Sequence, residues 1–310
     1  MMNNTEKWLS NYILSCRNIR TLSERTLQAY SNDIRSWFQF LEQEEVAPEK
    51  VNRDIARLYI SSLTMRQLSP ATINRTLSSL KGFYQYLEKR GDSSGNPFTA
   101  LRSQKNPSTL PVYLTNREVE ILIDESEGNS FESLRDKTLF ELLYSTGCRV
   151  SELCALNADA MKNDRILIRG KGGRQRFVFI GKSARDALSA YLPVRQEKLR
   201  SMGKGEKKAL ILDYRCDRLT TRGVYYIIQK YLRKTGLNRK VGAHAFRHAF
   251  ATELLNEGAD IRVVQEMLGH ASLSTTQVYT HTGIERIRQV YRRAHPHGRE
   301  RKRNHRSTVV

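Results

Sequence analysis

The stretch RILIRGKGGRQRFVFI, residues 165–180, contains two β-rich runs that flank a glycine-rich turn. Alternation on both sides of Gly170–Gly173 is the pattern of a β-hairpin with its tip at those glycines. Apolar residues elsewhere in the second part of the chain recur with helical periodicity. The helices expected there lie near residues 116–125, 131–145, 183–201, 220–235, 244–257, 261–268, 272–281 and 284–294. This part is therefore predicted to be mixed α/β, mostly helical, with a small antiparallel sheet.

The first hundred residues have helical patterns only. In ERTLQAYSNDIRSWFQFLEQ, residues 24–43, apolar side chains recur every three or four positions and so line one helical face. A second helix is expected from Ser69-Pro70 to Gly91, because serine caps, first-turn prolines and C-terminal glycines mark helix ends. With shorter helices near residues 5–16 and 53–66, the sequence predicts a four-helix N-terminal domain.

A break separates the two parts. The segment SQKNPSTLPVYLT, residues 103–115, has two prolines and no apolar periodicity, which is typical of an interdomain linker. We therefore predict a helical domain at residues 1–105, a linker at 106–112, a second domain at 113–297 and a basic, disordered tail at 298–310. A chain of 310 residues has room for about two such domains.

The charge balance indicates a polyanionic partner. The chain carries 52 Lys and Arg against 32 Asp and Glu, a net charge of +20, and the excess extends over both domains and the tail. Such a surplus favours nucleic acid over a membrane surface. There is no run of about 18 apolar residues and no signal peptide, so we expect a cytoplasmic protein without membrane contact.

The four cysteines, Cys16, Cys148, Cys154 and Cys216, are scattered and never form a C-x-x-C pair. Neither a zinc site nor a disulfide framework is indicated. We expect reduced and mostly buried thiols.

The candidates for chemistry are polar residues within structured segments. In HAFRHAFATELL, His244 and Arg247 share one face at the start of a helix, where the helix dipole adds to their charge and favours a phosphate. The other four candidates are Arg149 in TGCRVSEL, Lys171 at the hairpin tip, His270 in LGH and Tyr279 in LSTTQVYTH.

Each candidate also has an ordinary structural explanation. Arg149 could be a helix arginine beside Glu152, Lys171 an exposed turn residue, and His244 a capping or core histidine. Tyr279 could lie on the surface of a short helix that Ser272 caps.

Two ligand-binding alternatives are disfavoured. His244 and His248 are four residues apart, but a metalloprotease helix needs Glu where this chain has Ala245, and Arg247 brings a cation to the same place. The glycines of RGKGGR do not fit a phosphate-binding loop of the G-x-x-x-x-G-K-[ST] type, because the lysine lies between strands.

The order TGCRVSEL, GKGGRQRFV, HAFRH, LGH and a tyrosine nine residues later resembles the tyrosine recombinase, or phage integrase, family, most closely its bacterial Xer-type members. The resemblance covers nearly the whole chain. TLQAYSNDI and SPATINRTLSSLKGFYQYL resemble the core-binding, SAM-like domain of this family, and GIERIRQVYRRAHP resembles its C-terminal helix.

The resemblance implies six catalytic roles around one DNA phosphate. Arg149 and Arg247 would clamp the non-bridging oxygens, for which the guanidinium fork is well suited. Lys171 would be the general acid, although Lys162 and Lys182 are nearby. His244 would be the acid/base partner, His270 a further donor, and Tyr279 the nucleophile.

The chemistry agrees with these roles. A phenol with a pKa of about 10 needs a base and an electropositive pocket to attack at neutral pH. The implied reaction forms a 3′-phosphotyrosyl bond with no metal and no ATP. Departures from the family pattern are Phe246 in HAFRH and the absence of proline after the valine of FVFI.

The resemblance also implies an assembly. Protomers would clamp double-stranded DNA at a specific site and form a homo- or hetero-tetramer on two sites, exchanging the helix at 283–295, with Ile284, Ile287, Val290 and Tyr291 as its docking face. Because the first helix starts within ten residues, we expect no arm-binding domain. An Xer-type role in resolving chromosome or plasmid dimers is favoured.

Three alternatives remain open: a mobile-element integrase, a type IB topoisomerase and a non-catalytic DNA-binding regulator. The target DNA sequence, a second recombinase and an activating translocase cannot be read from the sequence.

Overall fold

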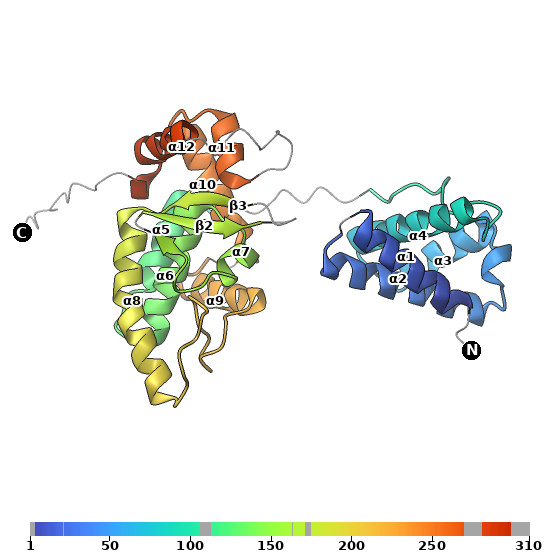
Figure 1. Ribbon diagram of the computed structural model, residues 1–310, viewed down its shortest axis with the longest axis horizontal. Helices are drawn as coiled ribbons and strands as arrows, with labels where there is room; N and C mark the ends of the chain where they lie inside the picture. The colour runs from blue at the N-terminus through green and yellow to red at the C-terminus, as the bar shows by residue number, and fades with distance from the viewer. Residues whose placement is uncertain are drawn as a thin grey trace, which may run out of the picture. The chain divides into compact units, whose positions relative to one another are not determined.

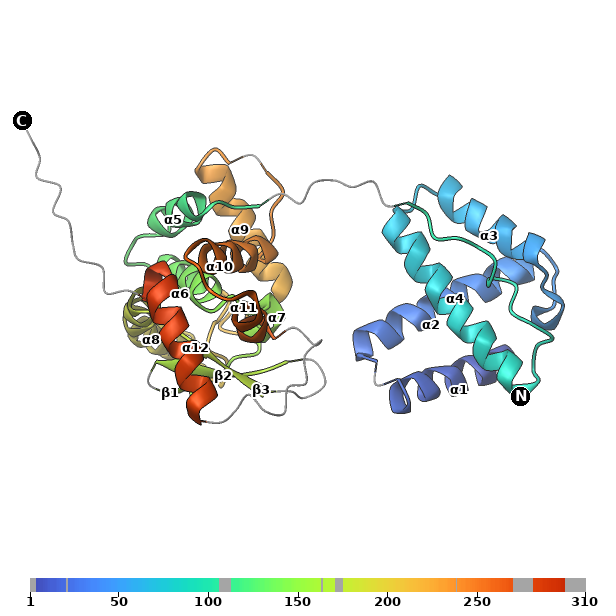
Figure 2. The same ribbon diagram turned by 90° about the horizontal axis from the view of Figure 1, so that it is seen from above.

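The computed structural model describes residues 4–20, 22–105, 113–162, 164–170, 175–237, 239–269 and 281–298. The chain forms two compact units, residues 1–110 and 111–310 (Figures 1 and 2). The division falls within the predicted linker, of which residues 106–112 lie outside the described part.

The N-terminal unit consists of four helices, as predicted. A 3-10 turn, η1, joins the second helix to the third. The bounds are α1 (Asn4–Asn18), α2 (Glu24–Gln43), η1 (Pro48–Lys50), α3 (Arg53–Met65) and α4 (Pro70–Arg90). The ends of α4 have the expected chemistry: Ser69 accepts a hydrogen bond from Thr72 N, and Gly91 ends the helix at φ 75°. The four helices are seen in Figure 2. They bury a common apolar core.

Aromatic rings dominate this core. Trp37 is fully buried, and its indole N–H donates to Tyr84 Oη at 3.1 Å. The carboxylate of Asp33 is also buried and accepts from Arg75 at 2.6 Å and from Thr76 at 3.1 Å. Burial raises the pKa of Asp33 in spite of these donors. A buried polar group held in this way fixes α2 against α4.

The C-terminal unit combines helices with one small sheet. In chain order its elements are α5 (Asn116–Glu125), α6 (Phe131–Thr146), α7 (Val150–Cys154), β1 (Met161–Lys162), β2 (Arg165–Arg169), β3 (Gln175–Phe179), α8 (Lys182–Ser201), α9 (Thr221–Lys234), α10 (His244–Asn256), α11 (Ile261–Leu268), α12 (His281–Ala294) and η3 (Pro296–Gly298).

The predicted hairpin is present as β2 and β3, which pair antiparallel with Ile166 opposite Val178 and Ile168 opposite Arg176. The short strand β1 adds to β2, giving the order β1-β2-β3. Of the predicted tip, residues 171–174 lie outside the described part. In Figure 1 the sheet lies between α11 and α12 on one side and α6, α8 and α9 on the other.

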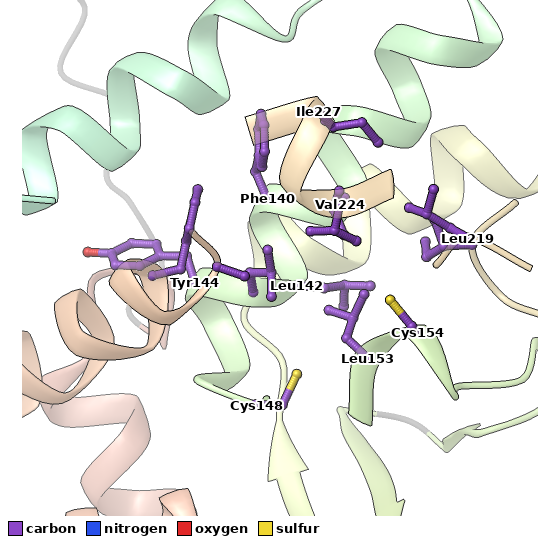
Figure 3. Packing of buried hydrophobic residues seen from close by; sticks show 14 of the residues in the cluster. Phe140, Leu142, Tyr144, Cys148, Leu153, Cys154, Leu219, Val224 and Ile227 are labelled. Carbon is purple, nitrogen blue, oxygen red and sulfur yellow. The ribbon is translucent and has the colours of Figure 1, made fainter. Parts of the chain in front are cut away.

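Helix α6 is the centre of this unit. From Thr138 to Thr146 every residue is buried, and the helix packs against α5, α8 and α10. Figure 3 shows Phe140 and Leu142 of α6 beside apolar residues of α7 and α9. All four cysteines of the chain are buried and free, as expected. No helix in the described ranges is long and apolar enough to span a membrane.

The last helix packs on its own chain. Helix α12 contacts α10, α11 and β3, and Tyr291 is buried with its hydroxyl 2.6 Å from Ser145 Oγ. The helix expected near residues 284–294 is present and begins slightly earlier, at His281. The helix predicted at 272–281 lies outside the described residues except for its last position.

Candidate active site

Arg247 is held inside the C-terminal unit by two backbone carbonyls. It lies in the first turns of α10 and is 6% exposed. Its Nη1 donates to Gly147 O at 2.9 Å and its Nη2 to Leu268 O at 2.7 Å. Burial, together with the nearby Arg149 and Arg176, lowers the pKa of Arg247 to about 10. The side chain therefore remains cationic at neutral pH.

Gly147 brings the end of α6 close to α10. It terminates α6 in the left-handed region, at φ 57°. A Cβ at this position would lie 2.4 Å from the ring of Phe250, so a larger residue would force that ring to shift. This close approach places the carbonyl of Gly147 in reach of Arg247 and directs the chain toward Arg149 two residues later.

Arg149 immediately precedes α7 and is the more accessible arginine. Its side chain is 40% exposed, and its Nη1 donates to Glu152 Oε1 at 3.0 Å. Its Nη2 lies 3.4 Å from Gly269 O, one residue after the carbonyl that Arg247 contacts. Two candidates that are 98 positions apart in the sequence thus meet at the C-terminal end of α11.

A third arginine joins them. Arg176 points inward from β3 and is 7% exposed. Its guanidinium forms a bidentate pair with Glu152, at 3.0 and 2.7 Å, and its Nε donates to Met267 O at 3.1 Å. Three successive carbonyls, those of residues 267, 268 and 269, therefore each accept a hydrogen bond from a different arginine.

Glu152 organises this cluster. Its carboxylate accepts from Arg176, from the side chain of Arg149 and from Arg149 N at 2.9 Å. Although burial favours the protonated acid, the hydrogen bonds from Arg176 and Arg149 hold the pKa of Glu152 below its ordinary value. One carboxylate thus stands among three guanidinium groups, and the remaining positive charge makes this a site for an anion.

His244 lies one turn before Arg247, at the first position of α10, and is exposed. His248, the second residue of the disfavoured metal pair, stacks on Tyr113 with ring centroids 3.8 Å apart, and burial lowers its pKa. No group of three metal-ligating side chains occurs in the described ranges.

The other three candidates, Lys171, His270 and Tyr279, lie outside the described residues. Lys182, which the sequence offered in place of Lys171, begins α8 and pairs with Asp186 at 2.6 Å. Residue 270 directly follows the three carbonyls that the arginines hold. The cluster therefore fixes the point at which the segment with His270 and Tyr279 begins.

The sequence reasoning missed the structural roles of Glu152 and Arg176. A signal for Arg176 was present, because it alternates with Val178 on the inward face of β3, where a charged residue needs a buried partner. Glu152 was noted only as a neighbour of Arg149. Nothing in the sequence indicated that one carboxylate serves both arginines.

Comparison with known proteins identifies the class. Residues 112–286 match the phage integrase family, and residues 9–91 match the N-terminal SAM-like domain of phage integrases. The chain belongs to the phage integrase family: it is a site-specific tyrosine recombinase, an enzyme that breaks and rejoins DNA.

Its relatives are of the Xer type. A tyrosine recombinase XerC of Thermodesulfovibrio yellowstonii is 39% identical over 302 residues, which cover 96% of this chain and 99% of the relative. The XerC of Listeria welshimeri is 41% identical over 295 residues, covering 94% and 97%.

Solved structures share the fold. XerH recombinase bound to a palindromic difH substrate, a post-cleavage complex, has a TM-score of 0.67 at 24% identity and covers 91% of this chain and 83% of its own. A lambda integrase dimer bound to a COC′ core site has a TM-score of 0.66 at 18% identity, covering 87% and 75%. The prediction of a mainly helical recombinase fold is confirmed.

Proposed function

We propose that this recombinase cleaves one DNA strand by attack of the Tyr279 hydroxyl on a phosphodiester. A 3′-phosphotyrosyl bond forms as the 5′ oxygen leaves, and reversal by a 5′ hydroxyl of another strand rejoins the DNA. The observation that carries the proposal is the convergence of Arg149 and Arg247 on neighbouring carbonyls of residues 268 and 269. Guanidinium groups gathered in this way suit the charge of a phosphate under attack.

Arg149 and Arg247 would hold the non-bridging oxygens. A guanidinium has five N–H donors, and the described hydrogen bonds use two of them in each residue. Arg149, the more exposed, would be the first to meet the DNA. Arg247, anchored at both ends of its fork, would be fixed before the phosphate arrives, so that no reorganisation is needed during the reaction.

The remaining roles belong to proton transfer. His244, at the rim beside Arg247, would act as acid/base partner of the tyrosine, and Lys171 would protonate the departing 5′ oxygen. His270 would donate a further hydrogen bond to the phosphate. Since the phosphotyrosyl bond conserves the energy of the broken bond and the cations stabilise the charge, the reaction would need neither ATP nor a metal.

The partners would be double-stranded DNA with a specific site and further copies of the chain or of a second recombinase, in a tetramer on two sites. Exchange of the C-terminal helix would require α12 to leave its own chain, breaking the contact of Tyr291 with Ser145, and to remake it on a neighbour. By its likeness to XerC proteins, the enzyme would resolve chromosome or plasmid dimers in the cytoplasm, during cell division and chromosome partition. A translocase would act as its activator.

The test is a trapped covalent complex. With a nicked or otherwise irreversible DNA substrate, the wild-type chain is expected to form an adduct that survives denaturation, and Tyr279→Phe to bind DNA with no adduct. Tyr225→Phe, which alters an exposed tyrosine of α9, is the matched control and should keep the adduct. An adduct with Tyr279→Phe would refute the assignment of the nucleophile.

Two further assays separate the alternatives. A type IB topoisomerase would relax supercoiled DNA without exchanging strands between two sites, and a DNA-binding regulator would give no adduct at all. A mobile-element integrase would join two unlike sites, whereas an Xer-type enzyme recombines two copies of one site.

A further inference from the structure

Arg176 has no role in the proposed reaction, yet in the described part of the chain it makes more hydrogen bonds than Arg149 or Arg247. All three nitrogens of its guanidinium donate. Nη1 and Nη2 donate to Glu152 at 3.0 and 2.7 Å, and Nε donates to the carbonyl of Met267 at 3.1 Å. The residue is 7% exposed, so its side chain is not available to bind DNA. Any influence of Arg176 on the reaction must pass through the residues that it contacts.

The end of α11 holds Arg176 in place from another side. Gly269 ends this helix in the left-handed region, at φ 68°. A Cβ at Gly269 would lie 3.1 Å from Cδ of Arg176 and 3.2 Å from its Nε and Cζ. Because glycine has no Cβ, the backbone can approach the side chain this closely, and the guanidinium has little room to turn away from Glu152. The fork of Arg176 is therefore presented to one carboxylate in a fixed geometry.

Glu152 is the residue through which Arg176 can act. The two oxygens that bind Arg176 also accept from Arg149: Oε1 from Nη1 at 3.0 Å and Oε2 from the backbone N at 2.9 Å. Burial raises the pKa of Glu152, but the hydrogen bond from Arg176 opposes it most strongly, followed by the one from Arg149 N, and the pKa is lowered as a result. The carboxylate therefore stays charged, and Arg176 is its main counter-ion.

The balance of charge decides what Arg149 can offer to a phosphate. Arg149 and Arg247 bring two positive charges, Glu152 removes one, and Arg176 restores it. Without Arg176 the buried carboxylate would have Arg149 as its remaining guanidinium partner among the described contacts. The side chain of Arg149 is 40% exposed and so has room to turn toward Glu152. A guanidinium whose fork is occupied by a carboxylate no longer presents that fork to a phosphate.

We propose that Arg176 is a positioning residue for DNA cleavage: by holding both oxygens of Glu152, it prevents this carboxylate from neutralising Arg149. Arg149 keeps one side-chain contact with Glu152, which orients it, and its other N–H donors remain for the phosphate. The inference rests on the proposed role of Arg149. It concerns the rate of cleavage and not the affinity for DNA, because the buried Arg176 does not contact the DNA.

Single-turnover adduct formation by Arg176→Met, compared with a matched control, tests this role. Arg195 of α8 is a buried arginine, 1% exposed, in the same unit but outside the cluster. It donates to three backbone carbonyls, those of Lys207, Ala209 and Leu210. Arg195→Met therefore removes a guanidinium that is equally buried. Both full-length variants are assayed with saturating trapping substrate at a temperature at which circular dichroism shows them to be folded.

Arg176→Met is expected to lower the rate constant of adduct formation about thirtyfold, less than the hundred- to thousandfold effect of losing a donor to the phosphate outright. Its affinity for the DNA should change less than about twofold, because contacts with other phosphates supply most of the binding. Arg195→Met should keep the wild-type rate constant. A wild-type rate constant for Arg176→Met, an equal loss in both variants, or a loss in affinity alone would overturn the inference.

Arg176→Lys is the conservative variant, and it decides the question if Arg176→Met does not fold. Lysine keeps the positive charge beside Glu152 but has one ammonium in place of a fork. Since an ammonium does not hold both carboxylate oxygens in one plane, the rate constant should fall about fivefold, to a value between those of wild type and Arg176→Met. A rate constant equal to that of wild type would contradict the inference.

The double variant Glu152→Gln with Arg176→Met identifies the cause of the loss. It has no carboxylate that could neutralise Arg149, and it leaves no unpaired buried charge. Its rate constant should therefore exceed that of Arg176→Met about tenfold. If the double variant were as slow as Arg176→Met, the carboxylate would not be the cause and the inference would fail.

The same assay distinguishes this inference from the proposed function. Wild type should form the adduct, and Arg149→Ala should form it far more slowly. If either result is not obtained, the proposed role of Arg149 fails and the inference fails with it. If both are obtained, a wild-type rate constant for Arg176→Met overturns the inference alone and leaves the proposed function standing.

Discussion

Glu152→Gln is the substitution that most directly tests the arginine cluster. The carboxylate is 6% exposed and binds Arg176 with both oxygens, at 3.0 and 2.7 Å. It also accepts from the side chain and the backbone of Arg149. Glutamine keeps the shape and one acceptor oxygen but removes the charge, and its amide nitrogen would face a guanidinium donor.

The expected cost follows from the charge left behind. Arg176 is 7% exposed and has no other carboxylate partner among its described contacts. Removing one member of a buried ion pair typically destabilises a protein by about 3–5 kcal/mol. Because the amide oxygen can still accept one hydrogen bond, we expect the lower end of this range, about 3 kcal/mol.

Urea denaturation measures this cost, and the protein contains its own reference. Both tryptophans, Trp8 and Trp37, lie in the N-terminal unit, so their fluorescence follows that unit alone, whereas circular dichroism follows both. For a slope of about 2 kcal/mol per M, the circular dichroism transition of the C-terminal unit should move down by about 1.5 M urea. The tryptophan transition should stay in place.

The double variant Glu152→Gln with Arg176→Met separates charge from shape. Replacing both partners leaves no uncompensated buried charge, so at least half of the lost stability should return. The reasoning would be refuted by a loss below about 1 kcal/mol in the single variant, or by a double variant that is no more stable than the single one.

Three further predictions concern the same site. Gly147→Ala should lower the free energy of unfolding by about 2–3 kcal/mol in a urea titration, because the new methyl group meets the ring of Phe250 and the residue has a positive φ. Gly91→Ala is the control: it also has a positive φ but meets no atom within 4 Å, so it should cost about 1 kcal/mol. Arg149→Ala should reduce adduct formation about a hundred- to thousandfold with little loss of stability, because this side chain is partly exposed. Arg247→Ala should reduce both adduct formation and stability, since the buried carbonyls of Gly147 and Leu268 would lose their hydrogen-bond donor. The difference in the free energy of unfolding between wild type and Glu152→Gln should be constant well above about pH 4.3, the ordinary pKa of glutamate. It should shrink as the pH falls through the lowered folded-state pKa of Glu152, because the protonated carboxyl no longer contributes its charge. A difference that grew in acid would contradict the lowered pKa.

Local sequence chemistry predicted much of the fold because it acts over a few residues. The ends of α4 were predicted from Ser69, Pro70 and Gly91, whose backbone preferences hold in any context. The hairpin β2–β3 followed from alternation around glycines. Helix α12 begins at His281, three residues before the range near 284–294 expected from periodicity. Its packing, with Tyr291 against Ser145, involves a partner 146 positions away in the sequence and could not be predicted from near neighbours.

For the site, the sequence by itself determined the chemical types and their order: two arginines in motifs that begin helices, a histidine one turn before the second arginine, and a tyrosine in a polar segment. Only the tertiary structure decided that Arg149, Arg176 and Arg247 bind three successive carbonyls at the end of α11, and that Glu152 compensates two of them. The physical reason is that propensity and periodicity reflect interactions between near neighbours. The free energy of a buried charge depends instead on donors and acceptors that folding brings together from distant parts of the chain.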